Sequence, residues 1–232
     1  MLINRKSFLV GTAATVLLPA EEAFARTKPI FVLPSSHTKR FAWTIDDGSS
    51  NSAIKGYLNL AQETDQHLTF FVTSSYSSWR NNASQIKDLL HQGKIQLGNH
   101  TFSHKNLVTA SDRVVKDELQ KCHDFMLNHF NYDARPYFRP TYGYWDKRVI
   151  DLAASVGYTV PVMWYGSIGD SGRTTDSRMI ELAIQWINSG RIVIDHANKM
   201  KAQHTLDQVM RVINVRGLKS VTLREAFGKN FR

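Results

Sequence analysis

Short apolar segments alternate with longer amphipathic segments along most of the 232-residue sequence, and this alternation limits the fold more than any other feature. An amphipathic helix between two strands returns the chain across the sheet, so consecutive strands pair in parallel. The prediction is an α/β fold, as a closed (β/α) barrel or as a doubly wound sheet, and element order alone does not choose between them. Seven segments have strand composition, at residues 40–45, 68–72, 94–98, 136–139, 158–162, 191–194 and 218–222. The clearest helical patterns cover residues 112–130, 147–156, 176–187 and 206–216.

The first 25 residues have the pattern of an export signal. Arg5 and Lys6 precede an apolar run at residues 8–18, and the small residues Ala23 and Ala25 follow it. This order predicts a signal peptide at residues 1–25 and a single domain at residues 26–232. The apolar run is shorter than the roughly 20 residues of a membrane-spanning helix, although an uncleaved anchor is an alternative. We therefore expect a secreted or cell-wall-associated protein with no stable membrane span after cleavage.

The net charge indicates which partners are possible, and the cysteine content limits the covalent cross-links. The formal net charge is +9 at pH 7, which favours contact with an anionic surface such as a charged cell wall or a nucleic acid. The export signal and the lack of a clustered basic helix favour the wall, so we expect no nucleic-acid partner. The single cysteine, Cys122, excludes an intrachain disulfide and is expected to be a small buried side chain.

Polar side chains follow several of the predicted strands. The carboxyl ends of parallel strands meet at one edge, where their loops form the site in both candidate architectures. Two adjacent carboxylates, Asp46 and Asp47, precede Gly48, which permits a sharp turn. Further polar groups follow the third to sixth strands, at residues 100–104, 139–143, 164–170 and 194–196. The sequence therefore predicts one site built from several strand ends.

His100 and His104 suggest a metal site. On one face of a helical turn, two histidines four residues apart would offer two nitrogens to one ion, and a carboxylate from elsewhere would complete the set. Such a pair is common by chance and predicts little alone. Its position after a strand, with a carboxylate pair at another strand end, makes a divalent-metal site the better interpretation.

Four short sequences occur in a characteristic order. Residues 44–48 read T-I-D-D-G, residues 100–104 H-T-F-S-H, residues 139–142 R-P-T-Y and residues 194–196 I-D-H. They resemble the T-F-D-D-G, H-x-x-x-H, R-x-P-Y and L-x-H motifs of the polysaccharide deacetylases, which include chitin and peptidoglycan deacetylases and share the NodB homology domain. The resemblance extends from about residue 40 to about residue 222 and implies a distorted (β/α) barrel with about seven parallel strands. It also implies one divalent metal ion, with zinc the first choice, and a catalytic domain at residues 26–232.

The resemblance assigns a role to each matching residue. These roles are metal ligands at Asp47, His100 and His104, a catalytic base at Asp46 oriented by Arg139, an oxyanion-binding backbone N–H at Tyr142, a general acid at His196 and a wall of the acetyl pocket at Ile194. The chemistry is consistent, because water must lose a proton to a base and an amine leaves only after it gains one. The metal charge and the N–H would stabilise the oxyanion.

The family has five motifs, and the remaining one, which is fourth in order between R-x-P-Y and L-x-H, departs from the family pattern here. Members have an aspartate three residues after a tryptophan, as the partner of the acid histidine, and a second tryptophan further on. Ser167 and Ser171 hold these places here. Asp195 adjoins His196, but successive side chains alternate along a strand, so we expect it to point away. Asp170 is the better substitute.

Aromatic residues near the strand ends suggest a sugar-binding groove. We expect Trp79, Trp145 and Trp164 to bind substrate, since flat rings at a rim stack on sugar faces. The predicted function is removal of N-acetyl groups from a polysaccharide, with peptidoglycan or chitin-like oligomers as substrates. Two alternatives are a weak or inactive carbohydrate-binding protein on the same fold and an acetyl-xylan esterase. A nucleic-acid binder, motivated only by charge, is a third and weaker alternative.

Overall fold

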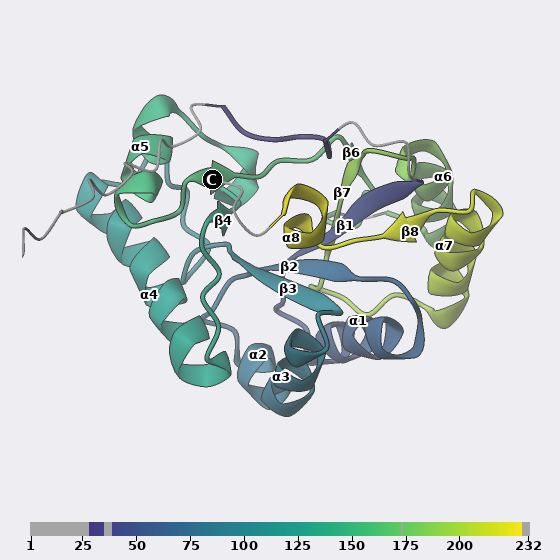
Figure 1. The fold of residues 1–232 in the computed structure, drawn as a ribbon. Coiled ribbons are helices and arrows are strands. Elements are labelled where there is room, and N and C mark those ends of the chain that lie inside the picture. Colours follow the sequence, from purple (N-terminus) through teal and green to yellow (C-terminus); the bar gives the residue numbers. More distant parts are fainter. Residues whose placement is uncertain (1–27, 35–38, 173, 229–232) are drawn as a thin grey trace, which may run out of the picture.

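A curled sheet of parallel strands forms the centre of the structure, a computed structural model that describes residues 28–34, 39–172 and 174–228 (Figure 1). Its strands pair in the order β5-β4-β3-β2-β1-β7-β6, and β8 pairs with the start of β1. The strands are β1 (Arg40–Asp47), β2 (Leu68–Val72), β3 (Ile95–Asn99), β4 (Tyr137–Phe138), β5 (Val160–Pro161), β6 (Gly166–Ser167), β7 (Ile192–His196) and β8 (Lys219–Ser220). All seven predicted strand segments contain a strand, and the two-residue β6 is additional. The expected signal peptide at residues 1–25 lies outside the described residues.

The segment at residues 30–33 links the β5 end of the sheet to the start of β7. Ile30 bridges to Val162 just after β5, and Val32 bridges to Arg191 just before β7. The backbone N–H of Leu33 also donates to the Gly190 carbonyl at 2.8 Å. Figure 1 shows this segment in purple along one rim of the sheet. The curled sheet, completed by this segment and covered by helices, is a distorted (β/α) barrel, as predicted, and not an open doubly wound sheet.

Helices connect the strands and cover the outside of the barrel (Figure 1). On α4, buried Val115, Leu119, Cys122 and Met126 follow one another at spacings of three and four, which places one apolar stripe against the sheet. The four helices with clear sequence patterns are present, and the last begins three residues earlier than predicted. The helices are α1 (Asn51–Glu63), α2 (Ser77–Asn81), α3 (Ala83–His91), α4 (Asp112–Phe130), α5 (Lys147–Ser155), α6 (Asp176–Trp186), α7 (Gln203–Val215) and α8 (Leu223–Phe227), with a 3₁₀ turn at Thr141–Gly143.

Alternation along the strands separates two apolar clusters and sets the direction of the polar side chains. Phe41, Trp43 and Ile45 of β1 pack in the larger cluster with the helices. Ala42 packs in the smaller cluster inside the barrel. Asp46 lies in the same alternation as Ala42, and on β7 His196 lies in the same alternation as the interior residue Ile192. Both polar side chains therefore point toward the barrel axis.

No helix of the described residues is long and apolar enough to cross a membrane. Cys122 is buried in α4, as expected, and burial raises the pKa of its thiol to about 12. This cysteine is therefore an unreactive packing residue.

Candidate active site

The polar strand ends converge on one cavity of about 390 Å³. Asp46 and His196 are register partners on neighbouring strands β1 and β7, so their side chains enter the same space. The predicted residues that line the cavity are Asp46, Asp47, His100, His104, Tyr142, Trp164, Ile194 and His196, joined by Gly143, Tyr144, Ser167, Ser171 and Asn198. The structure therefore brings together most of the predicted site, in the position expected for a (β/α) barrel.

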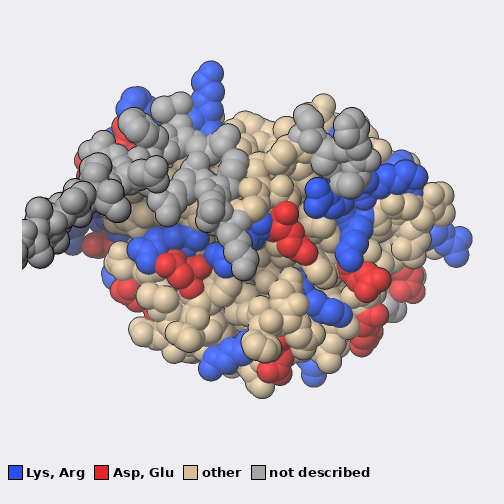
Figure 2. Space-filling model, in the orientation of Figure 1, with Lys and Arg blue, Asp and Glu red and all other residues tan. Residues whose placement is uncertain are grey.

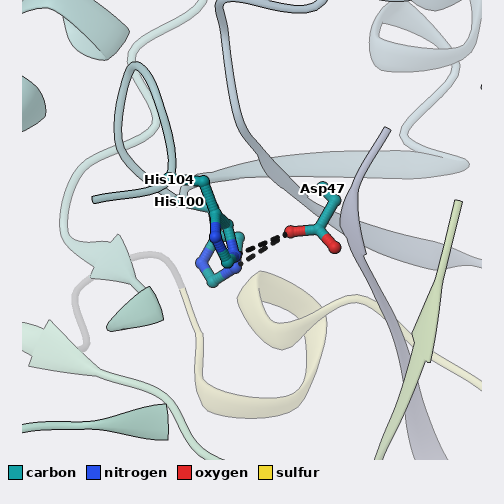
Figure 3. Close-up of side chains that lie close together, drawn as sticks. All are labelled: Asp47, His100 and His104. Carbon is teal, nitrogen blue, oxygen red and sulfur yellow. Dashed lines mark ion pairs between the residues drawn. The ribbon is translucent and has the colours of Figure 1, made fainter. Parts of the chain in front are cut away.

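Asp47, His100 and His104 form a cluster suited to a cation (Figure 3). Asp47 Oδ1 lies 3.3 Å from His100 Nε2 and 3.1 Å from His104 Nε2, and it is buried without a hydrogen-bond partner. His100 Nδ1 lies 2.8 Å from the Arg139 carbonyl, which can only accept a hydrogen bond. In the neutral ring the proton is therefore on Nδ1, and the Nε2 lone pair faces the carboxylate. A divalent ion bound by these three atoms would remove this conflict, so the residues fit the group that the family motifs imply.

Protons compete with such an ion for the same atoms. Burial lowers the pKa of His100, but the carboxylates of Asp46 and Asp47 raise it more, so the pKa is above its ordinary value. Burial raises the pKa of Asp47, but hydrogen bonds and charges from His100 and His104 outweigh this effect and lower it. A cation site of this kind is expected to lose affinity as the pH falls.

The expectation that the two histidines share a helical turn is wrong. The segment after β3 is a loop in which Thr101 and His104 adopt positive φ angles of 72° and 60°. Glu118 of α4 holds this loop, because its buried carboxylate accepts hydrogen bonds from the Ser103 backbone and hydroxyl at 2.7 and 2.8 Å. The loop, fixed from α4, brings both imidazoles to Asp47.

Side chains from two other segments fix Asp47 at the end of β1, one at its backbone and one at its carboxylate. Trp79 Nε1 donates to the Asp47 carbonyl at 3.1 Å, and a Cβ at Gly48, where φ is 95°, would lie 2.4 Å from the Trp79 ring. Trp79 has no exposed surface, so the prediction that it stacks on a sugar is wrong. Asn198 Nδ2 donates to Asp47 Oδ2 at 2.5 Å. Sequence reasoning missed Asn198, which lies in a loop after β7 without a distinguishing pattern.

Arg139 fixes the other carboxylate of the pair. Its guanidinium is fully buried, lies 2.5 Å from Asp46 Oδ1 and donates to the carbonyls of Val162 and Met163 at 3.1 Å. The guanidinium also lies over the Phe71 ring at 4.1 Å. A charge-assisted hydrogen bond from so immobile a donor sets the direction of the Asp46 carboxylate. The free oxygen of Asp46, Oδ2, lies 3.6 Å from His100 Nε2, beside the metal cluster.

His196 has a carboxylate partner despite the altered fourth motif. Its Nδ1 lies 2.9 Å from Asp170 Oδ1, which confirms the pairing proposed for Asp170. Burial lowers the pKa of His196, but the Asp170 hydrogen bond and the charges of Asp46, Asp170 and Asp47 raise it to about 9. Since Nδ1 is occupied, Nε2 is the nitrogen that His196 can offer to the cavity. Ser167 does not replace the carboxylate, and its hydroxyl accepts from the Gly169 N–H at 3.0 Å.

Aromatic side chains form one wall of the cavity. Trp164 and Tyr144 line it, whereas Trp145 is exposed nearby and is not among its lining residues. The rings of Tyr142 and Tyr144 lie 5.9 Å apart at 31°, and each side chain is 57% exposed. Tyr144, which the prediction of substrate-binding residues left out, has the position expected for Trp145.

The fold and the cavity together define a (β/α)-barrel protein with a candidate cation site, a buried Asp–Arg pair and an Asp–His pair. The family profile described as polysaccharide deacetylase matches residues 34–161, more than half of the chain. The protein therefore belongs to the polysaccharide deacetylase family, as the motifs indicated.

Individual relatives are distant. The chain is 26% identical to the peptidoglycan-N-acetylglucosamine deacetylase PgdA of Listeria monocytogenes over 86% of its own length, and it spans only 41% of that protein. The structure matches PdaA of Bacillus subtilis, a family 4 carbohydrate esterase, with a TM-score of 0.74 and 21% identity, covering 86% of this chain and 85% of that one. It also matches BA3943 of Bacillus anthracis, a CE4 family pseudoenzyme, with a TM-score of 0.74 and 22% identity, covering 87% and 69%. At this identity the structural matches establish the fold, and function depends on the site itself.

Proposed function

We propose that this protein is an exported, metal-dependent deacetylase that removes N-acetyl groups from a polysaccharide, most simply N-acetylglucosamine residues of peptidoglycan or chitin-like oligomers. The observation that carries the proposal is the buried Asp47 Oδ1, which faces two imidazole nitrogens in the cavity that also contains Asp46 and His196. Such an arrangement of buried charges is costly, and buried charges of this kind cluster at functional sites. The activity named for the Listeria relative supports the substrate class.

In this mechanism Asp47, His100 and His104 hold one divalent ion, for which zinc fits the nitrogen and oxygen donors. The bound ion would supply Lewis acidity, which makes water easier to deprotonate and a carbonyl easier to attack. Asp46, oriented by Arg139, accepts the proton of the attacking water. The backbone N–H of Tyr142 donates to the oxyanion, and Ile194 lines the space for the acetyl methyl group. His196 delivers a proton to the leaving amine from the other side of the scissile bond.

Export and domain organisation are part of the same proposal. Residues 1–25 would direct export and residues 26–232 would form the catalytic domain, which suits a cell-wall substrate. The overall charge of +9 favours an anionic wall. Among the described residues visible in Figure 2, Lys and Arg are interspersed with Asp and Glu, without the continuous basic band typical of nucleic-acid binders.

Acetate release from N-acetylated chitin and peptidoglycan oligomers by the purified, metal-loaded protein tests the function. Acetate in stoichiometric proportion to new free amines would support a deacetylase. Release only from acetylated xylan would identify an esterase instead. Sugar binding with stoichiometric metal but without acetate from any of these substrates would identify a carbohydrate-binding protein on this fold.

Asp170→Asn is expected to move the alkaline limb of the pH profile of kcat/KM toward lower pH. Loss of the Asp170 charge lowers the raised pKa of His196, so the protonated acid disappears at a lower pH, by about 1 to 3 units. The measurement is kcat/KM between pH 6 and pH 10. Asp176→Asn, at an exposed carboxylate on α6, is the matched control and should leave the limb in place. An unmoved limb in Asp170→Asn would show that His196 is not the group being titrated.

Tyr144→Ala is expected to raise KM for an oligosaccharide about threefold to tenfold while kcat changes less than twofold. The exposed ring at the cavity wall would stack on a sugar, an interaction of about 0.5 to 1.5 kcal/mol. Tyr144→Phe keeps the ring and should keep the parent KM. Equal kinetic constants for Tyr144→Ala and the parent would remove this ring from the binding site.

A further inference from the structure

A cluster of buried charges lies directly behind His196. Asp170 Oδ2 and Asp195 Oδ1 both accept hydrogen bonds from Lys201 Nζ, at 2.8 and 2.6 Å. The same two oxygens also accept from the backbone N–H of His196, at 2.8 and 3.0 Å. Two carboxylate oxygens that share two donors must lie close together, so one ammonium group separates two like charges.

Asp195 lies on the helix side of β7, as the alternation of side chains predicted. Its Oδ2 accepts from Trp43 Nε1 at 3.2 Å and from the Tyr57 hydroxyl at 2.5 Å. Lys201 Nζ also donates to the Tyr57 oxygen at 2.7 Å. The Lys201 side chain is only 4% exposed, so its charge acts on this cluster and is little screened by water.

The charges in the cluster balance only when Lys201 is present. Asp170 pairs with His196 through Oδ1 and with Lys201 through Oδ2, whereas Asp195 has Lys201 as its cationic partner. Two adjacent buried carboxylates without a cation take up a shared proton. Asp195 takes up such a proton first, because its pKa is raised, and a proton shared between Asp195 Oδ1 and Asp170 Oδ2 would weaken the negative charge that faces His196 Nδ1. Loss of Lys201 would therefore weaken the Asp170–His196 pair, although Lys201 itself pairs with Asp170 and Asp195 rather than with the imidazole.

We propose that Lys201 is a positioning residue for His196: it neutralises Asp195 and holds Asp170 Oδ2, so that Asp170 Oδ1 remains a charged partner of the imidazole. The proposal rests on the acid role of His196 in the proposed function. Lys201, in the loop after β7, would thereby help to maintain the charged partner of the acid histidine, which the fourth motif supplies in other members of the family.

The surroundings of the cluster support this role. Burial and the neighbouring charge of Asp170 raise the pKa of Asp195 to about 7. Of the two carboxylates, Asp195 is therefore the one whose charged form depends more on Lys201. The charged groups that act on His196 are Asp46 and Asp47 at the end of β1 and Asp170 after β6, and Lys201 in the loop after β7 pairs with Asp170. Among these, Lys201 is the cation that bridges Asp170 and Asp195.

The test compares Lys201→Met with the double variant Lys201→Met, Asp195→Asn. The double variant removes one positive and one negative charge, so Asp170 keeps its charge against His196. We expect kcat of the single variant to fall about tenfold to a hundredfold, with KM within about twofold and the alkaline limb at lower pH. The double variant should recover kcat to within about threefold of the parent and restore the limb. Lys199→Met, at an exposed neighbour, is the matched control and should match the parent.

Two outcomes would overturn the proposal. A folded Lys201→Met with the parent pH profile would show that Asp170 does not need the lysine. A double variant as impaired as the single variant would show that Lys201 only supports the fold. Should the single variant not fold, the double variant alone decides between recovery and loss. Should the parent release no acetate, NMR titration of the His196 ring in the parent and both variants gives the same comparison without turnover.

Discussion

Asp46→Asn is expected to retain the metal ion and to lose turnover by about a hundredfold to ten-thousandfold. The amide cannot accept a proton from water, and general-base catalysis contributes about that factor. The change is nearly isosteric, so the new amide oxygen can still accept from Arg139, whose guanidinium is fixed by the Val162 and Met163 carbonyls. His196→Ala should behave in the same way, because His196 is likewise no ligand in the proposed site. Metal content by elemental analysis and kcat on a chitin or peptidoglycan oligomer provide the measurement.

The outcomes separate catalysis from metal binding. A variant that loses metal and activity together would make Asp46 a ligand rather than a base. A His196→Ala variant that deacetylates at the parent rate would remove His196 as the acid and leave the proton to Asp170, His204 or water. His204 is the weakest of these candidates, because its side chain is 65% exposed and pairs with Asp176.

His104→Ala is expected to purify with little metal and no measurable turnover. It removes one of three protein ligands and leaves Asp47 Oδ1 with a single nitrogen, at His100. His91→Ala removes a histidine at the end of α3 and serves as the matched control, with metal content and activity like the parent. The comparison requires zinc titration with a competing chelator, at constant pH because protons compete for the same nitrogens. Stoichiometric metal at undiminished affinity in His104→Ala would contradict the assignment of the ligands.

The position of the site could be predicted from sequence because parallel topology permits few arrangements. Once residues 40–45 and 191–194 are identified as strands, Asp46 and His196 must lie at the same edge of the sheet. Alternation along β7 likewise predicts that Asp195 points to the face opposite to that of His196. Local periodicity and general rules of chain topology are sufficient for both predictions.

What sequence reasoning missed depends on long-range packing. Trp79 follows a strand, as a residue at the rim of the site would, but its ring packs against Gly48 and is completely buried. The loop of His100 and His104 is shaped by Glu118, a residue of α4 that no local pattern connects with it. Lys201 and Asn198 lie in the loop after β7 and reach their partners only after the barrel has formed. A single sequence does not encode such contacts in any spacing that can be read directly.

The bridges of Ile30 and Val32 have a consequence for the order of folding. These residues pair with segments near Val162 and Arg191. Residues 30–33, near the N-terminal end of the sequence, can therefore complete their pairing only after most of the chain is available. Contacts between segments so distant in sequence are slow to form, because a long loop must close first. The pairing of residues 30–33 that completes the barrel is therefore expected late in folding. A chain that crosses a membrane unfolded would arrive with its sheet still open, and the edges next to β5 and at the start of β7 would be exposed to other chains until residues 30–33 pair with them.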